Sequence, residues 1–254
     1  MVLLVREYRV ETDGVPGRVF EPPAPRGLLL LGHRGTHGKD DAFYVDLGRL
    51  LASECGLAVA CIDAPCHGER KPNSGDPAAD DAAVLHAVVS GADQTAGDWE
   101  ATAMALSAFG PPIAMMGFSM GALVGLVTAA RLPSIRALVL GVAGVPAFAV
   151  QGKRDPGSTT PQLRAAAALG DVDVLMLNMT RDEVCPPAGV LELFEAIPGV
   201  RKRLTFWEGD HDHVPPELVG YALDSLRRSL GDVLTGRAQV PNRRKGAAGL
   251  TGRA

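Results

Sequence analysis

From residue 27 onward, short apolar runs alternate with segments whose apolar residues follow helical spacing. Runs that are apolar at nearly every position predict strands buried on both faces, as in a parallel sheet. We expect such strands at 27–32, 57–63, 112–117, 135–140, 172–177 and 203–208. Strands that alternate with helices predict an α/β fold, in which a mostly parallel sheet is doubly wound.

The N-terminal residues predict a different kind of pairing. Short strands at 4–10 and 16–21 are separated by Thr12-Asp13-Gly14, a sequence typical of a hairpin turn. We therefore expect an antiparallel pair at the N-terminal edge of the sheet.

The helical segments are assigned from spacing and capping signals. We expect helices at 41–55, 79–89, 99–109, 162–169, 187–196 and 216–230, and one after Gly121. In the first of them, Phe43, Leu47, Leu50 and Leu51 are predicted to share the buried face. Asp98 is predicted to cap the helix at 99–109.

Residues 1–232 are predicted to form one domain, which is within the size range of a single α/β domain. Two less regular segments, 71–97 and 143–170, are predicted to be loops or lids over the site. Residues 233–254 hold basic residues and no acidic one, and they are predicted to be a disordered tail.

Charge and cysteine spacing exclude several classes of function. The formal net charge of -4 argues against a nucleic-acid-binding protein. No apolar run has the length of a membrane span and no signal h-region is visible, so we expect a cytoplasmic protein. The four cysteines lack metal-ligand spacing, and His33, His37 and His67 are divided between two separate glycine-rich turns, so no metal or cofactor is expected.

The segment Gly117-Phe118-Ser119-Met120-Gly121 carries the strongest chemical signal. It follows an apolar strand and precedes a helical pattern, so Gly-x-Ser-x-Gly stands in the strand–turn–helix setting of a nucleophile elbow. The glycines allow close approach of strand and helix, and Ser119 is predicted to be a nucleophile.

An activated serine needs a base, and the base needs an orienting group. Asp182 and His211 follow Ser119 in chain order, each just after a predicted strand, where sites of parallel sheets form. His211 would take the serine proton, and Asp182 would orient the imidazole. Glu183 and His213 are the local alternatives.

The oxyanion of a tetrahedral intermediate needs preorganised N–H donors. The backbone N–H of Met120 is one candidate, and Gly35 or Arg34 is the other, with Gly35 preferred because the backbone must approach the substrate there. Phe118 is a candidate for lining the acyl pocket.

One acidic residue near these turns is predicted to be structural. Asp63, at the end of its strand, is predicted to cap or anchor the following turn. Arg70 is expected to pair with Asp63, and binding of a substrate carboxylate is the alternative role for Arg70.

With these motifs the chain resembles the α/β-hydrolase superfamily over nearly all of residues 1–232. The resemblance is carried by the His33-Arg34-Gly35 turn, the Asp63–Gly68 segment, the Gly117–Gly121 elbow, and Asp182 with His211. Within the superfamily it looks like the single-domain esterases near the dienelactone hydrolases and the peptidase-like acyl hydrolases. Dienelactone hydrolases use a cysteine nucleophile where this chain has Ser119, and their usual His-Gly pair is replaced by His33-Arg34.

The resemblance implies a serine hydrolase. We expect a carboxylesterase that cleaves small to medium acyl esters through an acyl-enzyme, without a cofactor, as a monomer or homodimer. A thioesterase, an amidase or peptidase, and a C–C hydrolase with the same triad remain alternatives. A non-catalytic binding protein on this fold is the alternative from a different class.

Overall fold

The computed structural model describes residues 4–147, 160–199 and 201–234. The predicted tail from residue 235 onward, and residues 148–159 of the second predicted lid, lie outside the described residues.

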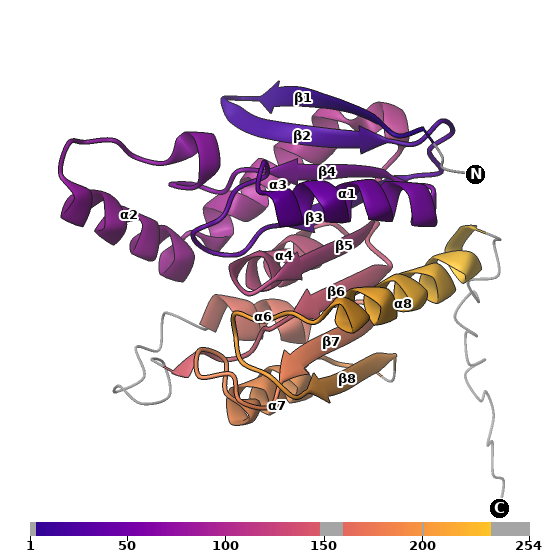
Figure 1. Ribbon diagram of the computed structural model, residues 1–254. Helices are drawn as coiled ribbons and strands as arrows, with labels where there is room; N and C mark the ends of the chain where they lie inside the picture. Colours follow the sequence, from indigo (N-terminus) through magenta and orange to yellow (C-terminus); the bar gives the residue numbers. More distant parts are fainter. Residues whose placement is uncertain (1–3, 148–159, 200, 235–254) are drawn as a thin grey trace, which may run out of the picture.

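A single mixed sheet organises the described part of the chain (Figure 1). Its eight strands have the order β1-β2-β4-β3-β5-β6-β7-β8. They are β1 (Arg6–Thr12), β2 (Val15–Glu21), β3 (Leu28–Gly32), β4 (Ala58–Ile62), β5 (Pro112–Phe118), β6 (Ala137–Gly141), β7 (Asp173–Met179) and β8 (Lys202–Trp207). β2 pairs antiparallel with β1 and β4, and the other pairs are parallel. The predicted fold class is therefore confirmed.

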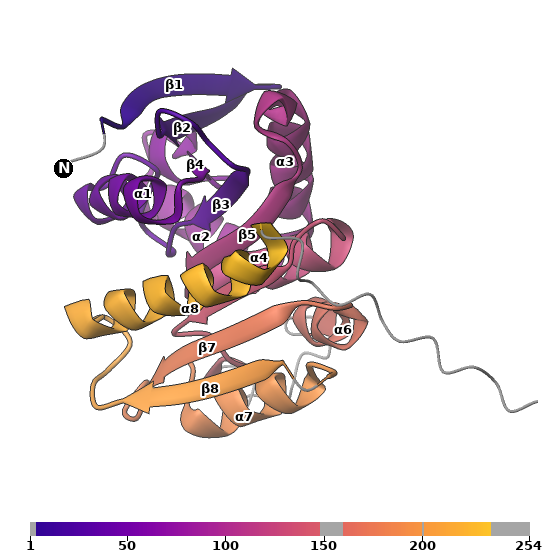
Figure 2. The same ribbon diagram turned by 90° about the vertical axis from the view of Figure 1, so that its right-hand side faces the viewer.

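Helices cover both faces of the sheet (Figure 2). The described α-helices are α1 (Ala42–Cys55), α2 (Pro77–Ser90), α3 (Ala92–Ala105), α4 (Met120–Arg131), α6 (Thr160–Ala168), α7 (Pro187–Ala196) and α8 (Pro216–Leu234). Helices α1 and α8 pack on one face, and α3, α4, α6 and α7 on the other. Helix α2 projects from the edge at which the parallel strands end (Figure 1). None of the described helices is long and apolar enough to cross a membrane.

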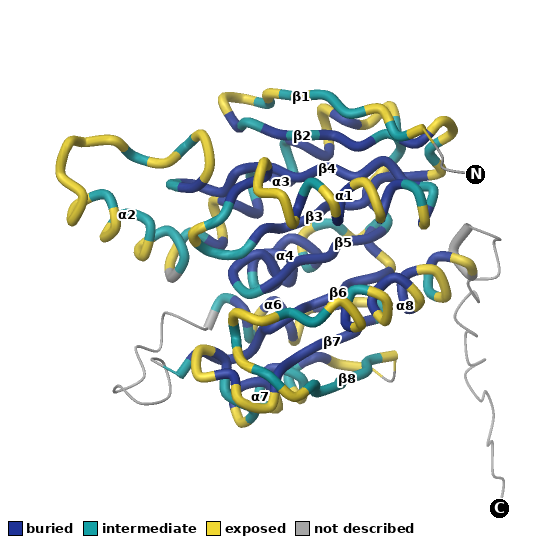
Figure 3. Tube along the Cα trace, viewed as in Figure 1, coloured by how far each residue is buried: buried dark blue, intermediate teal, exposed yellow. Residues whose placement is uncertain are grey.

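Side-chain alternation along the buried strands builds two cores. Leu28 and Leu30 of β3 point into the core beneath α3 and α4, whereas Leu29 and Leu31 point into the core beneath α1 and α8. All four are fully buried, and the central strands are dark along their length in Figure 3. Continuous apolar runs arise because both faces of these strands are covered.

The buried face of α1 differs from the predicted one. Tyr44, Leu47 and Leu51 are buried, whereas Phe43 and Leu50 are 39% and 38% exposed. Gly48 lies on the same buried face, where a Cβ atom would lie only 2.3 Å from the Phe20 ring. The absence of a side chain there lets the Tyr44–Leu51 side of the helix pack closely on β2.

The segment 71–97, predicted to be a loop or lid with a helix at 79–89, is largely helical. Helix α2 begins at Pro77, and the carboxylate of Asp76 accepts hydrogen bonds from the N–H groups of Ala78 (3.0 Å) and Ala79 (3.4 Å). This is a regular N-cap with proline at the first helical position.

The predicted cap at Asp98 is wrong. Asp98 lies inside α3, which begins at Ala92, and its carboxylate accepts a hydrogen bond from Arg70 at 2.6 Å. The acidic side chain serves a tertiary ion pair instead of a helix terminus.

Candidate active site

Ser119 lies at the turn between β5 and α4 with a strained backbone, φ 51° and ψ −119°. An L-residue rarely adopts a positive φ, so neighbouring contacts must hold this conformation. The Ser119 N–H donates to the carbonyl of Gly141 at 2.8 Å, and its own carbonyl accepts from Ala122 and Leu123 at 3.0 Å each. The hydroxyl is thereby fixed at the start of a helix.

The elbow glycines are required by close backbone contacts. A Cβ atom on Gly117 would lie 2.4 Å from the backbone of Gly121, and one on Gly121 would lie 2.5 Å from the backbone of Gly32. Any larger residue would separate β3, β5 and α4. The Gly-x-Ser-x-Gly pattern therefore reflects packing around the serine.

The three predicted triad residues are hydrogen-bonded in a chain. Ser119 Oγ lies 2.8 Å from His211 Nε2, and His211 Nδ1 lies 2.8 Å from Asp182 Oδ2. The side chain of Asp182 is fully buried, and that of His211 is 13% exposed. Loops after β5, β7 and β8 supply the three residues, as expected for strand ends that share one edge of a sheet.

The second oxygen of Asp182 fixes the orientation of its carboxylate. Oδ1 accepts hydrogen bonds from the N–H groups of Val184 (2.9 Å) and Cys185 (2.7 Å), which leaves Oδ2 for His211. An ionised carboxylate only accepts, so His211 Nδ1 carries the proton in this pair. Its Nε2 atom is then free to accept the proton of Ser119.

The local alternatives lie away from this chain of hydrogen bonds. Glu183 is exposed to solvent. His213 has an 84% exposed side chain and pairs with Asp210 at 2.7 Å. The geometry brings Asp182 and His211, and not these neighbours, to Ser119.

Two backbone N–H groups remain candidates for oxyanion donors. Met120 is the first residue of α4, so its N–H has no intrahelical acceptor and lies at the positive end of the helix dipole. Gly35 lines the same cleft as Ser119. The N–H of Arg34, the alternative donor, is already bonded to the Tyr44 hydroxyl at 2.8 Å, which favours Gly35.

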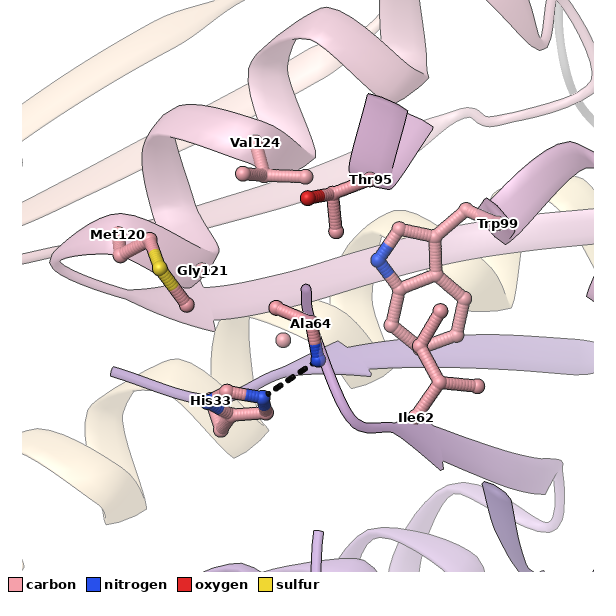
Figure 4. Close-up of a pocket in the computed structure, with 9 residues that line it drawn as sticks. His33, Ile62, Ala64, Thr95, Trp99, Met120, Gly121 and Val124 are labelled. Carbon is pink, nitrogen blue, oxygen red and sulfur yellow. Dashed lines mark hydrogen bonds between the residues drawn. The ribbon is translucent and has the colours of Figure 1, made fainter. Parts of the chain in front are cut away.

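The His33 ring supports this turn through a hydrogen bond at each of its nitrogens, and Figure 4 draws the one to Ala64. Its Nδ1–H donates to the Arg34 carbonyl at 2.7 Å, and Nε2 accepts from the N–H of Ala64 at 3.0 Å. Burial lowers its pKa to about 4, so the ring stays neutral. The His33 ring and the side chain of Met120 border a small cavity in the core that extends to Trp99.

Asp63 anchors the turn after β4, although its partner is not the predicted one. Its fully buried carboxylate accepts hydrogen bonds from the Lys39 ammonium (2.9 Å), from the Lys39 N–H (2.8 Å) and from the Glu69 N–H (2.9 Å). Arg70 instead donates to the backbone carbonyl of Asp63 and to the carboxylate of Asp98. Sequence reasoning missed Lys39 because no local pattern marks a pair that forms across two loops.

A cleft of about 420 Å³ opens beside Ser119. Helix α2 contributes apolar side chains to one wall, and the turn after β3 and the loop after β8 contribute polar groups to the other. The lining residues are Arg34, Gly35, Thr36, His37, Asp81, Val84, Leu85, Val88, Ser119, His211 and Asp212. The first predicted lid segment therefore borders the nucleophile as a helix.

Phe118 is not placed where the sequence suggested. Its side chain is fully buried in the core beneath α1 and α8, and its ring packs edge-on against Phe43 at 5.6 Å. It shares a strand face with Ala114 and Met116, which also point into that core. The alternation along β5 was the signal that could have excluded it from the acyl pocket.

Within the described ranges, no group of three or more His, Cys, Asp or Glu side chains is arranged to hold a metal ion. The buried Cys185 thiol is poorly suited to act as a nucleophile, because burial raises its pKa to about 12. Ser119 and His211, which lie 2.8 Å apart in the cleft, are therefore its candidate reactive groups.

Comparisons with known proteins agree with this architecture. The alpha/beta hydrolase family profile matches residues 28–247. A cold-adapted esterase from an Arctic intertidal metagenomic library is 28% identical with a TM-score of 0.69, over 90% of this chain and 95% of that one. TT1662 from Thermus thermophilus is 25% identical with a TM-score of 0.71, over 90% and 99%.

More distant structures share the fold alone. A putative dienelactone hydrolase from Klebsiella pneumoniae is 16% identical with a TM-score of 0.68, over 90% of this chain and 99% of that one. No curated protein matches the chain. Since the family profile spans most of the sequence, the chain belongs to the alpha/beta hydrolase family.

Proposed function

We propose that the protein is a serine carboxylesterase that cleaves small to medium acyl esters. The observation that carries the proposal is the Ser119–His211–Asp182 chain, with 2.8 Å at each link. The similarity to a cold-adapted esterase supports the same reaction class.

In the proposed reaction, Ser119 Oγ attacks the ester carbonyl while His211 Nε2 accepts its proton. Asp182 stabilises the imidazolium that forms. The negative charge on the tetrahedral intermediate faces the N–H groups of Met120 and Gly35. Collapse of this intermediate expels the alcohol, which takes the proton from His211, and leaves an acyl-enzyme. A water molecule, deprotonated by His211, then attacks the acyl carbonyl and releases the acid and free Ser119.

The cleft supports a substrate of modest size. Its volume of about 420 Å³ lies at the lower end of the range for small-molecule pockets. Val84, Leu85 and Val88 offer an apolar surface to a short chain. The polar groups concentrate near Ser119 and His211, where the reacting carbonyl would lie.

Replacement of Ser119 with Ala tests the proposal. The variant is expected to lose hydrolysis of p-nitrophenyl acetate and butyrate and labelling by a fluorophosphonate, and to keep its circular dichroism spectrum. Ser53→Ala, at a surface serine of α1, is the matched control and should retain both signals.

Full activity of Ser119→Ala would refute the serine mechanism. A panel of oxygen esters, thioesters and amides with the same acyl group tests the bond specificity. Preference for thioester or amide would move the assignment to a thioesterase or an amidase. An inert panel together with an unlabelled wild-type protein would indicate a binding protein.

A further inference from the structure

The turn after β3, which supplies the proposed oxyanion donor Gly35, has an arginine at position 34. The side chain of Arg34 contacts the loop that carries His211. We infer that Arg34 is a positioning residue that fixes the backbone at His211 relative to the oxyanion turn. The oxyanion turn is residues 33–38, and the histidine loop is residues 209–213. This inference rests on the proposed function, because it assigns a role in the same reaction.

The contacts run from one guanidinium to two consecutive residues of the histidine loop. Arg34 Nη2 donates to the carbonyl of His211 at 2.7 Å and to Asp212 Oδ1 at 3.0 Å. Arg34 Nη1 donates to the carbonyl of Asp212 at 3.3 Å. The Arg34 side chain is only 13% exposed, whereas the Asp212 side chain is 85% exposed. The guanidinium, which is partly shielded from solvent, therefore acts mainly on the loop backbone.

Arg34 itself is fixed to the body of the protein. Its N–H donates to the buried Tyr44 hydroxyl at 2.8 Å. Its carbonyl accepts from His33 Nδ1 at 2.7 Å and from the N–H of His37 at 3.4 Å. The anchor is therefore rigid at its base, and the guanidinium can hold another segment in place.

The histidine loop has little burial of its own. Asp210, Asp212 and His213 are exposed, and the N–H groups of Asp212 and His213 are bonded to Asp210 Oδ1 inside the loop. A tie to the neighbouring strand end exists at Gly209, whose carbonyl accepts from the N–H of Arg181 at 2.9 Å. That bond holds the start of the loop, whereas Arg34 holds the backbone at His211 itself.

The chemistry of the link suits arginine better than lysine. A planar fork can donate to two carbonyl groups at a fixed spacing, whereas an ammonium is a single flexible point charge. The same residue is thus bonded to the turn that would bind the oxyanion and to the loop that carries the base. A displacement of either part by about 1 Å can lower the rate about 100-fold.

Arg34→Ala is expected to lower kcat for p-nitrophenyl butyrate about 100-fold, with KM changed less than about twofold. The rate of fluorophosphonate labelling of Ser119 should fall in parallel, because labelling needs the same base and oxyanion donors. Added guanidinium chloride, well below denaturing concentration, should restore part of kcat. Arg34→Lys should lose at least about tenfold, because it cannot donate to both carbonyls.

Arg181→Ala is the matched control. This arginine lies next to Asp182, has a 64% exposed side chain and pairs with the exposed Glu208. Alanine keeps the backbone N–H that bonds to Gly209, so removal of the side chain should leave kcat unchanged. Ser119→Ala should stay inactive with guanidinium, which would show that the rescued hydrolysis still needs Ser119 and is not catalysed by guanidinium in solution.

An unchanged kcat in Arg34→Ala, or a raised KM with unchanged kcat, would overturn the inference; the latter would make Arg34 a substrate-binding group. If Arg34→Ala does not fold, Arg34→Lys carries the test, and wild-type activity in a folded Arg34→Lys overturns the fork argument. Loss of the proposed function is detected separately, because it appears as activity retained in Ser119→Ala.

Discussion

Asp182→Asn isolates the role of the carboxylate in setting the tautomer of His211. In the native site, Asp182 Oδ1 accepts from the N–H groups of Val184 and Cys185. The asparagine carbonyl oxygen must keep this position, because an NH2 group there would face two donors. The NH2 group is therefore forced toward His211. It would donate to Nδ1, so the proton of the ring would move to Nε2.

With its proton on Nε2, His211 donates to Ser119 and can no longer accept the serine proton. A wrong tautomer of this kind lowers kcat by about 10⁴-fold in a Ser-His-Asp triad, which corresponds to about 5.5 kcal/mol in the activation free energy. The unfolding free energy should change by less than about 1 kcal/mol, because both N–H groups keep their acceptor. Asp182→Ala removes that acceptor and should destabilise the protein by about 1–3 kcal/mol for each N–H left unpaired.

Initial rates with p-nitrophenyl acetate and urea denaturation of the same preparations measure the two quantities. Glu183→Gln, at the exposed neighbour, is the control and should behave as wild type. Asp182→Asn with more than about a tenth of wild-type kcat would refute the tautomer argument. Equal stability of Asp182→Asn and Asp182→Ala would refute the account of the Oδ1 hydrogen bonds.

Three further predictions concern packing, pH dependence and specificity. Gly121→Ala places a Cβ atom 2.5 Å from the backbone of Gly32 and should lower the free energy of unfolding by about 1–3 kcal/mol, measured by thermal or urea unfolding. Gly97→Ala, at a position in open space on α3, is the control and should raise the free energy of unfolding by about 0.5–1 kcal/mol. Because the pKa of His33 is lowered to about 4, the unfolded state binds its proton first as pH falls, so up to about 3 kcal/mol of stability should disappear between about pH 6.5 and 4. Urea denaturation should show this loss in the wild type and a smaller one in His33→Gln; equal pH dependence would contradict the prediction. Leu85→Ala should lower kcat/KM for p-nitrophenyl hexanoate about fivefold, which corresponds to about 1 kcal/mol of lost apolar contact. The value of kcat/KM for p-nitrophenyl acetate should stay unchanged. Equal losses on both esters would contradict an apolar wall at Leu85.

The strand framework was predictable because its signal is local and redundant. In Leu28–Gly32 the apolar side chains fill two separate cores, so every position is constrained and the run stands out in the sequence. The observed central strands lie within two residues of the predicted ones. The same edge of the sheet then collects the residues that follow β5, β7 and β8, which is why Ser119, Asp182 and His211 could be proposed together.

Positions were harder to predict where a side chain satisfies a distant partner. Asp98 has the composition of a helix cap, yet it pairs with Arg70, 28 residues away in sequence. The carboxylate of Asp63 bonds to Lys39 through contacts that depend on how two turns meet. Arg34 contacts a loop 177 residues away. Such pairs carry no periodicity, so only the folded arrangement identifies them.

The elbow shows why a motif alone does not define a nucleophile. Ser119 holds a φ of 51°, a conformation that costs on the order of 1–3 kcal/mol for a non-glycine residue. This cost is offset by the hydrogen bond from the Ser119 N–H to Gly141 and by the close packing of Gly32, Gly117 and Gly121, which together fix where α4 begins relative to β5. A Gly-x-Ser-x-Gly segment without a strand beside it at Gly141 and without a glycine at position 32 could relax to an ordinary N-cap, with its hydroxyl turned to the helix. The serine is presented to His211 because the packing of β3, β5, β6 and α4 excludes that relaxation, so preorganisation of the proposed nucleophile is a property of the core.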